Sequence, residues 1–373
     1  MRIFIIIKKA FIFVLKRLKL NHIIYKFSRS DIINFDDKLV WNAREFLENY
    51  SHNPKTSCIC KNKIEPYVDI HIIIPAYNVE AYIEECMDSI LLNPTQKYTY
   101  LVNVINDGST DKTAEILKKY ENHPCVEVIT QANKGFSGAR NTGLSHIRGR
   151  YIVFVDSDDL MDWRGVEKMM DVALETGADI VHGAYTTMSD NGDFRRFIAN
   201  TTGKLEITKL GGQPWAKLFR SELFCDVCFP EHYWYEDSIF AQIVFPQISV
   251  ACGIAENSYY YRNRASGITN QGINKPKSID SYWITEQLFE DRSKFGLEIT
   301  DQYYEYVLHM VKLTFSRIRL QPQDVKKNTF ILFCDFIDKH FSGFHAHSSK
   351  GKEIEKIIKT RNLRKCISFA KWM

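Results

Sequence analysis

The sequence predicts an α/β fold in which a mostly parallel sheet is covered by helices on both faces. Between residues 68 and 181, apolar runs of four or five residues alternate with segments whose apolar residues recur at helical spacing. Strands that alternate with helices in this way form βαβ units, and such units build parallel sheets. The composition, 45% apolar and 25% charged, is that of a globular protein and excludes disordered, collagen-like and disulfide-scaffold classes.

Each element is predicted from its local pattern of apolar residues. The predicted strands are 70–74, 101–105, 126–130, 151–155 and a fifth that begins at 179–181. The predicted helices are 83–91, 110–120, 137–147 and 163–175, of which the third is rich in small residues and is expected to end at Gly149. A helix is also expected around 39–47, the alternation becomes irregular beyond 185, and helical spacing returns at 280–341.

The charge is unevenly distributed along the chain. The net charge is +4, but residues 1–30 carry +8 and residues 349–373 carry +6, which leaves −10 on residues 31–348. A protein that binds duplex nucleic acid normally carries its basic residues on the body of the fold. The sequence therefore predicts no nucleic-acid partner.

The first twenty residues are apolar but interrupted by basic side chains. Arg2, Lys9 and Lys16 recur every seven residues and so share one helical face, while most of the apolar residues fall elsewhere on the wheel. The longest uncharged run is six residues, far short of the ~20 that a membrane span needs. We expect an interfacial helix on an anionic membrane surface. The alternative is a helix that docks on the body of the protein with its basic face in solvent.

Polar and small residues follow four consecutive predicted strands. They lie at 75–78, 106–109, 133–138 and 156–159. In open α/β sheets, ligands bind outside the carboxyl ends of the strands. Turn preference alone could explain any one of these segments, but four in succession indicate a ligand crevice at one edge of the sheet.

The cluster from Asp156 to Asp159 holds three carboxylates within four residues. Such carboxylates repel one another unless a cation neutralises them, and oxygen ligands suit Mg²⁺ or Mn²⁺. The sequence has no GxxxxGK[ST] loop and no GxGxxG motif, which disfavours ATPase and dinucleotide-binding functions. A divalent cation that bridges a diphosphate fits the pattern better.

The nine cysteines include a CxC at Cys58 and Cys60 and a CxxC at Cys225 and Cys228. No stretch has the features of a cleavable signal peptide, so reduced thiols are expected. A zinc site is disfavoured, because it needs four ligands at suitable spacing and the chain has no second CxxC.

Four segments together resemble the family 2 glycosyltransferases, whose catalytic domain has the GT-A fold. They are IIIPAYNVEAYIEECMDSIL, INDGSTDKT, NKGFSGARNTGL and GRYIVFVDSDD, in this order and spacing. The segments PWAKLFRSELF, FPEHYWYEDSIF and YYYRNRASGIT resemble the branch of this family that assembles bacterial surface polysaccharides. The resemblance covers about residues 68–270.

This resemblance implies a role for each matching position. Pro75, Tyr77 and Glu80 would lie along the nucleoside pocket, with Asp107 on the base and Asp156 at the ribose. Lys134 and Arg140 would position the donor, and Arg262 and Arg264 would lie near the diphosphate. Asp158, together with Asp156, would hold the metal, Mg²⁺ or Mn²⁺, as part of a DXD motif. Asp237 would be the catalytic base, with its neighbour Glu236 as the alternative base.

The resemblance also implies three regions. Residues 1–66 form the basic N-terminal helix and linker, 67–275 the glycosyltransferase domain, and 276–373 a helical region with a basic tail. Within the central domain, 67–185 would be the nucleotide-sugar half and 186–275 the acceptor half. In the acceptor half, Trp215 and the aromatic residues 233–235 either stack on acceptor sugars or belong to the core.

The expected function is an inverting transfer of a hexosyl or N-acetylhexosaminyl group from a nucleotide-diphosphate sugar, with a UDP-sugar as the expected donor. The acceptor would be a hydroxyl of a growing, lipid-linked cell-surface glycan, such as a capsule, exopolysaccharide or lipopolysaccharide. The expected location is the cytoplasmic face of the inner membrane, with peripheral attachment. Two alternatives are an inactive glycan-binding scaffold and a sugar-nucleotide pyrophosphorylase. The latter would need a basic, glycine-rich loop after the first strand, where the chain has residues 75–78.

Overall fold

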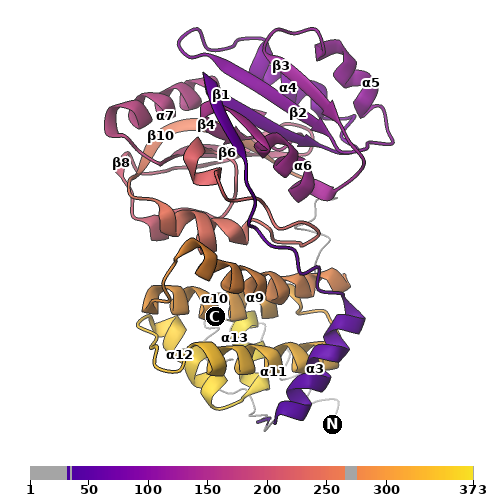
Figure 1. Ribbon diagram of the computed structural model, residues 1–373, viewed down its shortest axis with the longest axis vertical. Coiled ribbons are helices and arrows are strands. Elements are labelled where there is room, and N and C mark those ends of the chain that lie inside the picture. Colours follow the sequence, from indigo (N-terminus) through magenta and orange to yellow (C-terminus); the bar gives the residue numbers. More distant parts are fainter. Residues whose placement is uncertain (1–31, 34–35, 265–274, 373) are drawn as a thin grey trace, which may run out of the picture. The chain divides into compact units, whose positions relative to one another are not determined.

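The computed structural model describes residues 32–33, 36–264 and 275–372 (Figure 1). The helix predicted within the first twenty residues lies outside these ranges. The described residues form two compact units. One comprises 36–53, 275–286 and 298–372, and the other comprises 54–264 and 287–297. The second unit contains the sheet.

The sheet is mixed, and its parallel half is the one predicted from the sequence. Its strands are β1 (Lys63–Ala76), β2 (Tyr100–Asn106), β3 (Val126–Thr130), β4 (His146–Phe154), β5 (Leu160–Met161), β6 (Ile180–Ser189), β7 (Phe194–Ile198), β8 (Gly203–Lys204), β9 (Lys217–Arg220) and β10 (Ala251–Asn263). Among the described residues they form one sheet in the order β3-β2-β1-β4-β9-β6-β10-β5, with β7 paired to β6 and β8 paired to β10. Strands β3, β2, β1 and β4 are parallel, whereas β9 runs antiparallel to both β4 and β6.

Helices cover the sheet and build the other unit (Figure 1). They are α3 (Asp37–Tyr50), α4 (Ile83–Leu91), α5 (Thr113–Leu117), α6 (Gly135–Leu144), α7 (Trp163–Thr176), α9 (Asp280–Arg292), α10 (Asp301–Arg317), α11 (Gln323–His340), α12 (Ser349–Lys359) and α13 (Leu363–Trp372). Helix α6 packs on β1 and β2, and α7 packs on β6 and β10. The predicted α/β fold is confirmed.

Strand β1 runs through the centre of the core. Ile72, Ile73 and Ile74 are fully buried. Because successive side chains of a strand point to opposite faces, a run that is buried throughout must be covered on both faces. The Pro75 ring directly follows this run and is half-buried at the edge of the sheet.

Helix α6 lies unusually close to β1, because Gly143 faces the strand without a side chain. A Cβ at this position would collide with the side chain of Ile73. This approach places Arg140, one turn earlier on the same helix, near the carboxyl ends of the strands.

The prediction that the helix 137–147 ends at Gly149 is wrong. Helix α6 ends at Leu144, and β4 begins at His146, so Gly149 lies inside a strand that pairs with β1. A Cβ on Gly149 would collide with the backbone nitrogen of His71. The glycine is therefore required for the close approach of two strands and does not mark the end of a helix.

The helical unit is held together by apolar packing and a few polar contacts. The Arg44 guanidinium donates two hydrogen bonds to the Glu286 carboxylate, and the Asp36 side chain caps α3 by accepting from the Leu39 N–H at 2.9 Å. No helix among the described residues is long and apolar enough to cross a bilayer.

Candidate active site

The loops after β1 and β2 are tied together at the edge of the sheet. Asn78 has a left-handed backbone (φ 50°), and its side-chain oxygen accepts a hydrogen bond from the Thr110 N–H at 2.8 Å. The exposed Glu80 carboxylate accepts from the Lys112 N–H at 2.8 Å. Tyr77, which directly precedes Asn78, is about half exposed. The two loops therefore form one bonded rim, and Tyr77 presents its ring at this rim.

Asp107 is buried with one carboxylate oxygen unused. Its Oδ1 accepts from the Gln131 side chain at 2.7 Å and from the Lys134 N–H at 2.8 Å. Its Oδ2 is buried and has no hydrogen-bond partner in the described structure. A buried acceptor without a donor costs free energy, about 1–3 kcal/mol or more for a charged group. Asp107 is therefore ready to accept a hydrogen bond from a ligand N–H.

The turn that follows β4 carries the carboxylates of the DXD motif. The buried Asp159 braces this turn, because it accepts from the Tyr259 hydroxyl at 2.8 Å and from the Arg262 N–H at 2.6 Å. Burial, reinforced by the charges of Asp158 and Asp156, raises the pKa of Asp159 well above its usual range. Tyr259 also accepts from the Asp156 N–H at 3.0 Å, so one phenol fixes both ends of the turn.

Asp158 is less buried than its neighbour Asp159. Its Oδ2 lies 2.5 Å from Nε of Arg264. Burial and the charge of Asp156 raise the pKa of Asp158, while Arg264 opposes this effect. Among the described residues, no three His, Cys, Asp or Glu side chains are grouped as a complete metal site. A cation held by Asp158 and Asp156 would take its remaining ligands from phosphate and water, as Mg²⁺ usually does.

Arg140 joins this turn to the predicted catalytic pair. Its Nη2 lies 2.7 Å from Asp156 Oδ1, and its Nη1 lies 2.7 Å from Glu236 Oε1. The buried guanidinium also lies over the rings of Phe136 and Phe229. Burial lowers the pKa of Arg140, but the two carboxylates more than compensate and raise it above its usual value. The arginine is therefore a permanent cation shared by two carboxylates.

The predicted acid pair occupies two different environments. Glu236 is buried, and burial raises its pKa to about 7, with Arg140 opposing and Asp237 adding to the rise. Asp237 is half-buried and lies near Lys217. Burial lowers the pKa of the Lys217 ammonium to about 7, and Asp237 opposes this shift. Of the two acids, Asp237 is the one that a molecule in solution can reach.

Arg262 and Arg264 lie on the same side of the DXD turn but have different partners. The Arg262 guanidinium donates to the carbonyl oxygens of Asp158 and Asp190 at 2.8 Å each, and it pairs with Glu85 at 2.6 Å. These bonds hold the turn in place. Arg264, through its pair with Asp158, lies closer to the carboxylate that a cation would use.

The aromatic residues predicted for the acceptor mostly serve packing. Tyr233 is buried, and its hydroxyl accepts from the Lys55 N–H at 3.0 Å. Trp215 is stacked against Tyr259 and against Tyr261, with ring centroids 5.0 Å apart in each case. Trp234 is half-buried.

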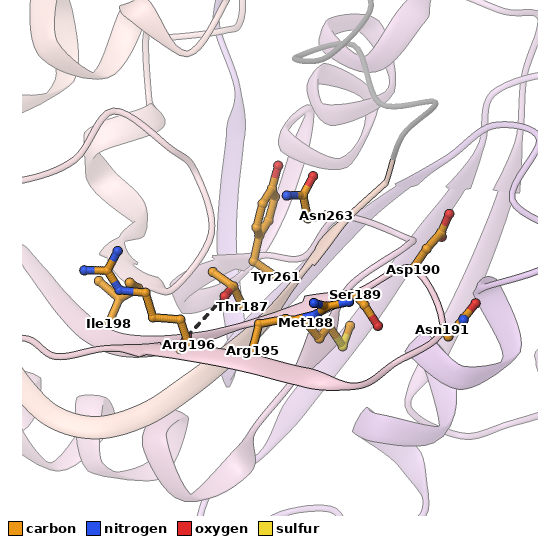
Figure 2. A pocket seen from close by; sticks show the side chains of 10 residues that line it. All are labelled: Thr187, Met188, Ser189, Asp190, Asn191, Arg195, Arg196, Ile198, Tyr261 and Asn263. Atoms are coloured by element: carbon orange, nitrogen blue, oxygen red, sulfur yellow. Dashed lines mark hydrogen bonds between the residues drawn. The ribbon is translucent and has the colours of Figure 1, made fainter. Parts of the chain in front are cut away.

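An open groove of about 740 Å³ adjoins the DXD turn (Figure 2). It is lined by residues of β6, β7 and β10 and of the turn between β6 and β7: Thr187, Met188, Ser189, Asp190, Asn191, Arg195, Arg196, Ile198, Tyr261 and Asn263. None of these positions belongs to the site predicted from the sequence. In the sequence, the groove was indicated only by the YYYRN run at 259–263. This run contains Tyr259, which holds the DXD turn, and the residues of β10 that form one wall of the groove.

Comparison with known proteins identifies the sheet unit. Residues 71–226 match the family described as glycosyl transferase family 2. This part of the chain is therefore similar to the family 2 glycosyltransferases. The matched range contains every predicted site residue up to Arg140 and the whole DXD turn, whereas the acid pair lies just beyond it.

Relatives of the domain are bacterial glycosyltransferases. The chain is 32% identical over 223 residues to the uncharacterized glycosyltransferase EpsJ of Bacillus subtilis, which covers 54% of this chain and 62% of EpsJ. It is 31% identical to the poly(ribitol-phosphate) beta-glucosyltransferase of Bacillus spizizenii, over 53% of this chain and 33% of that protein. The chain therefore spans between about a third and two thirds of the length of these relatives.

A solved structure shows the same fold. TarS residues 1–349 of S. aureus, in complex with UDP, superposes with a TM-score of 0.52 over 81% of this chain and 90% of that one, at 17% identity. The predicted GT-A arrangement is confirmed by this likeness. The roles of individual site residues stay predictions, which the next subsection develops.

The raised pKa of Glu236 predicts a dependence of stability on pH. Between the ordinary value of 4.5 and about 7, the folded state keeps a proton that the unfolded chain has lost, so the free energy of unfolding falls as pH rises. Glu236→Gln removes this titration. The variant should therefore gain stability relative to the wild type from pH 5 to 7, by at most about 1.4 kcal/mol per pH unit, and the gain should level off above pH 7.

Urea unfolding of both proteins across this pH range measures the effect. Glu222→Gln, at an exposed carboxyl outside the site, is the matched control. A difference between Glu236→Gln and wild type that stays constant from pH 5 to 8 would show that Glu236 does not titrate there.

Proposed function

We propose that the protein is an inverting glycosyltransferase that transfers a hexosyl or N-acetylhexosaminyl group from a UDP-sugar to a hydroxyl of a growing cell-surface glycan. The observation that carries this proposal is the Arg140 bridge, which joins the DXD turn to the Glu236–Asp237 pair through two 2.7 Å contacts. A donor site and an acid that can act as a base are thereby held side by side. The S. aureus TarS structures, which were solved in complex with UDP and with UDP-GlcNAc, support the choice of donor.

The donor nucleoside would bind at the rim formed after β1 and β2. The unused Oδ2 of Asp107 would accept the imide N–H of uracil, and this bond would satisfy the buried oxygen. The half-exposed Tyr77 ring would lie against the base. This pairing favours uracil over cytosine, because the N3 of cytosine carries no hydrogen to donate.

The diphosphate would lie over the DXD turn. Asp158 and Asp156 would hold Mg²⁺ or Mn²⁺, which stabilises negative charge on the departing nucleoside diphosphate when it is bound. Arg264, next to Asp158, would add a second positive charge on the same side. The raised pKa of Asp158, caused by burial and by Asp156, is the mark of a carboxylate in need of a neighbouring cation.

Asp237 would act as the general base. It would take the proton of the acceptor hydroxyl while the hydroxyl oxygen attacks the anomeric carbon and the bond from that carbon to the diphosphate oxygen breaks. A single displacement of this kind inverts the anomeric configuration. Glu236 is buried and bonded to Arg140, so its role is to fix the loop that carries Asp237.

The proposed acceptor and location are supported by the relatives and by the charge at the chain ends. The beta-glucosyltransferase of Bacillus spizizenii is named for a surface polymer, poly(ribitol-phosphate). In this chain, helices α12 and α13 and the residues flanking α12 expose six basic residues: Lys350, Lys352, Lys356, Lys359, Arg364 and Lys371. We infer that the protein lies on an anionic membrane surface, where a lipid-linked glycan would be accessible.

Two substitutions separate the cation site from the base. Asp158→Asn should both weaken the metal-dependent binding of UDP and abolish sugar transfer. Asp237→Asn should keep UDP and Mn²⁺ affinity, because Asp237 lies outside the DXD turn, while transfer falls by about two to four orders of magnitude. Calorimetry of UDP with Mn²⁺, together with a transfer assay from a screen of UDP-sugars, tests both.

Glu236→Gln is the matched control, since it removes the neighbouring acid. If Glu236→Gln loses turnover with unchanged UDP affinity and Asp237→Asn keeps more than about a tenth of wild-type turnover, the base is Glu236. An enzyme that binds UDP equally well with and without EDTA would contradict the cation in this proposal.

Membrane contact predicts a salt-sensitive association with anionic vesicles. Each basic residue near an anionic surface contributes about 1 kcal/mol, so replacing Lys350, Lys352, Lys356 and Arg364 with Gln should weaken binding at least about tenfold. Sedimentation with phosphatidylglycerol vesicles measures this, and phosphatidylcholine vesicles are the control. Equal binding to both lipids would remove the electrostatic basis of the proposal.

A further inference from the structure

The groove of about 740 Å³ beside the DXD turn has no role in donor binding or in proton transfer (Figure 2). Residues 187–189 of β6 line it, and Arg195 and Arg196 of β7 form a second wall. Tyr261 and Asn263 of β10 form the third wall. In Figure 2, Arg196 and Ile198 lie at one end, and Asp190 and Asn191 at the other.

One end of this groove lies next to the DXD turn. The Arg262 guanidinium donates both to the carbonyl of Asp190, in the groove, and to the carbonyl of Asp158, in the DXD turn. Asn263 directly precedes Arg264, which pairs with Asp158. A chain that lies in the groove would therefore reach the turn at the groove's Asp190 end.

The groove is lined by more positive than negative charge. Arg195 and Arg196 are exposed, and within the described part of the chain neither guanidinium makes an ion pair with a carboxylate. The carboxylate of Asp190 accepts from the Tyr82 hydroxyl at 2.8 Å. Each guanidinium presents a planar set of donors that fits a carboxylate or a phosphate.

We propose that this groove holds an acidic stretch of the acceptor glycan, whose carboxylates or phosphodiesters bind Arg195 and Arg196 while a sugar ring lies on Tyr261. The proposal rests on the proposed transferase function and narrows its substrate class to anionic glycans. Aromatic rings such as Tyr261 combine an apolar face with a polar tip, which suits the faces and hydroxyls of a sugar.

Direct binding tests this assignment without relying on turnover. The probes are a glucuronate-containing tetrasaccharide, a glycerol-phosphate tetramer and neutral maltotetraose, titrated calorimetrically into the full chain. An acidic probe should bind, maltotetraose should not bind comparably, and R195Q/R196Q should weaken the acidic probe about tenfold or more, as lost charged hydrogen bonds do. Binding of the glucuronate probe would identify carboxylate as the recognised group, and binding of the glycerol-phosphate probe would identify phosphodiester.

The control is Arg150→Gln, an exposed arginine on β4 without an ion pair in the described structure. It should bind the acidic probes as the wild type does. Equal affinity of R195Q/R196Q and wild type, or equal binding of the neutral probe, overturns the groove assignment. Failure of the transferase proposal would show instead as a loss of UDP binding, which is measured in the same samples.

The CxC and CxxC motifs have no part in the proposed transferase function. An antiparallel bridge between Ile59 and Val227 brings them together, with the Cys228 N–H donating to the Cys58 carbonyl at 2.8 Å. Alternate residues of extended chain share one face, so Cys60 lies diagonally opposite Cys228. The thiols of Cys60 and Cys228 lie close enough to each other to interact.

The two thiols differ in acidity. The interaction with Cys228 lowers the pKa of Cys60 below its usual value, although burial opposes this. The same interaction, together with burial, raises the pKa of Cys228. Both residues are half-buried and so are not sealed in the core. Thiolates are the attacking species in disulfide exchange, which makes Cys60 the nucleophile and Cys228 its resolving partner.

We infer that Cys60 and Cys228 form a reversible disulfide on reaction with a small-molecule disulfide such as oxidised glutathione. The Cys60 thiolate attacks one sulfur of glutathione disulfide and releases one glutathione thiolate. Cys228 then attacks the Cys60 sulfur of the mixed disulfide and releases the second. Two protein thiols are oxidised, one glutathione disulfide is reduced to two glutathiones, and the two thiol protons pass to them.

This disulfide would fix the segment before β1 to the segment that leads to the acid pair. One residue after Cys228, the Phe229 N–H donates to Asn141 at 2.7 Å, and the Thr56 hydroxyl donates to the Glu231 carbonyl. The cross-link would therefore reinforce contacts that already position the loop before Glu236.

Peptide mapping under non-reducing conditions tests the pairing. After treatment with oxidised glutathione, a cross-linked peptide pair containing Cys60 and Cys228 should appear and should vanish with dithiothreitol. Cys60→Ser should abolish it, and Cys225→Ser, at the exposed cysteine of the same motif, should keep it. A stable mixed disulfide on Cys60 alone, a different pairing, or one tightly bound zinc per chain released by thiol modification overturns the inference.

Discussion

The buried guanidinium of Arg140 is the constraint on which the site depends. A cation removed from water is stable only when it is paired, and here it is shared by Asp156 and Glu236 at 2.7 Å each. Removal of the guanidinium would leave both carboxylates without this cation, at a cost of about 3–5 kcal/mol. The DXD turn and the acid-pair loop are thereby locked in one geometry. The close packing of α6 on β1, which Gly143 permits, holds the guanidinium at that junction.

Around this cation the site accumulates negative charge that the protein neutralises only in part. Asp159 is satisfied by Tyr259 and by the Arg262 N–H. Asp158 pairs with Arg264, but burial together with Asp156 keeps its pKa raised. A bound cation would relieve the repulsion between these carboxylates. On the proposed function, binding of a cation and a diphosphate would remove an unfavourable interaction as well as add contacts.

The parallel half of the sheet could be predicted from the sequence because its signals are local. Runs such as 70–74 are buried on both faces, and the polar segments after them meet at one edge whatever the rest of the chain does. Gly149 was wrongly assigned to the end of a helix. In the sequence, a glycine that strand packing requires looks the same as a glycine that ends a helix. The Arg140–Glu236 pair joins residues 96 positions apart. The cysteine pair depends on the bridge between Ile59 and Val227, and the groove is built from β6, β7 and β10. Such long-range contacts leave no local period in the sequence.

The backbone around the acid pair explains why aromatic residues there serve packing more than recognition. Ala216, His232 and Tyr235 all have left-handed backbones although none is glycine, and each such residue costs about 1–3 kcal/mol. Strain of this size persists only where the surroundings enforce it. The buried Tyr233, held through its hydroxyl, and Trp215, stacked on two tyrosines, supply that enforcement. On the proposed function, aromatic packing at these two positions would fix the direction in which Asp237 meets an acceptor, and would leave recognition of the acceptor to the groove.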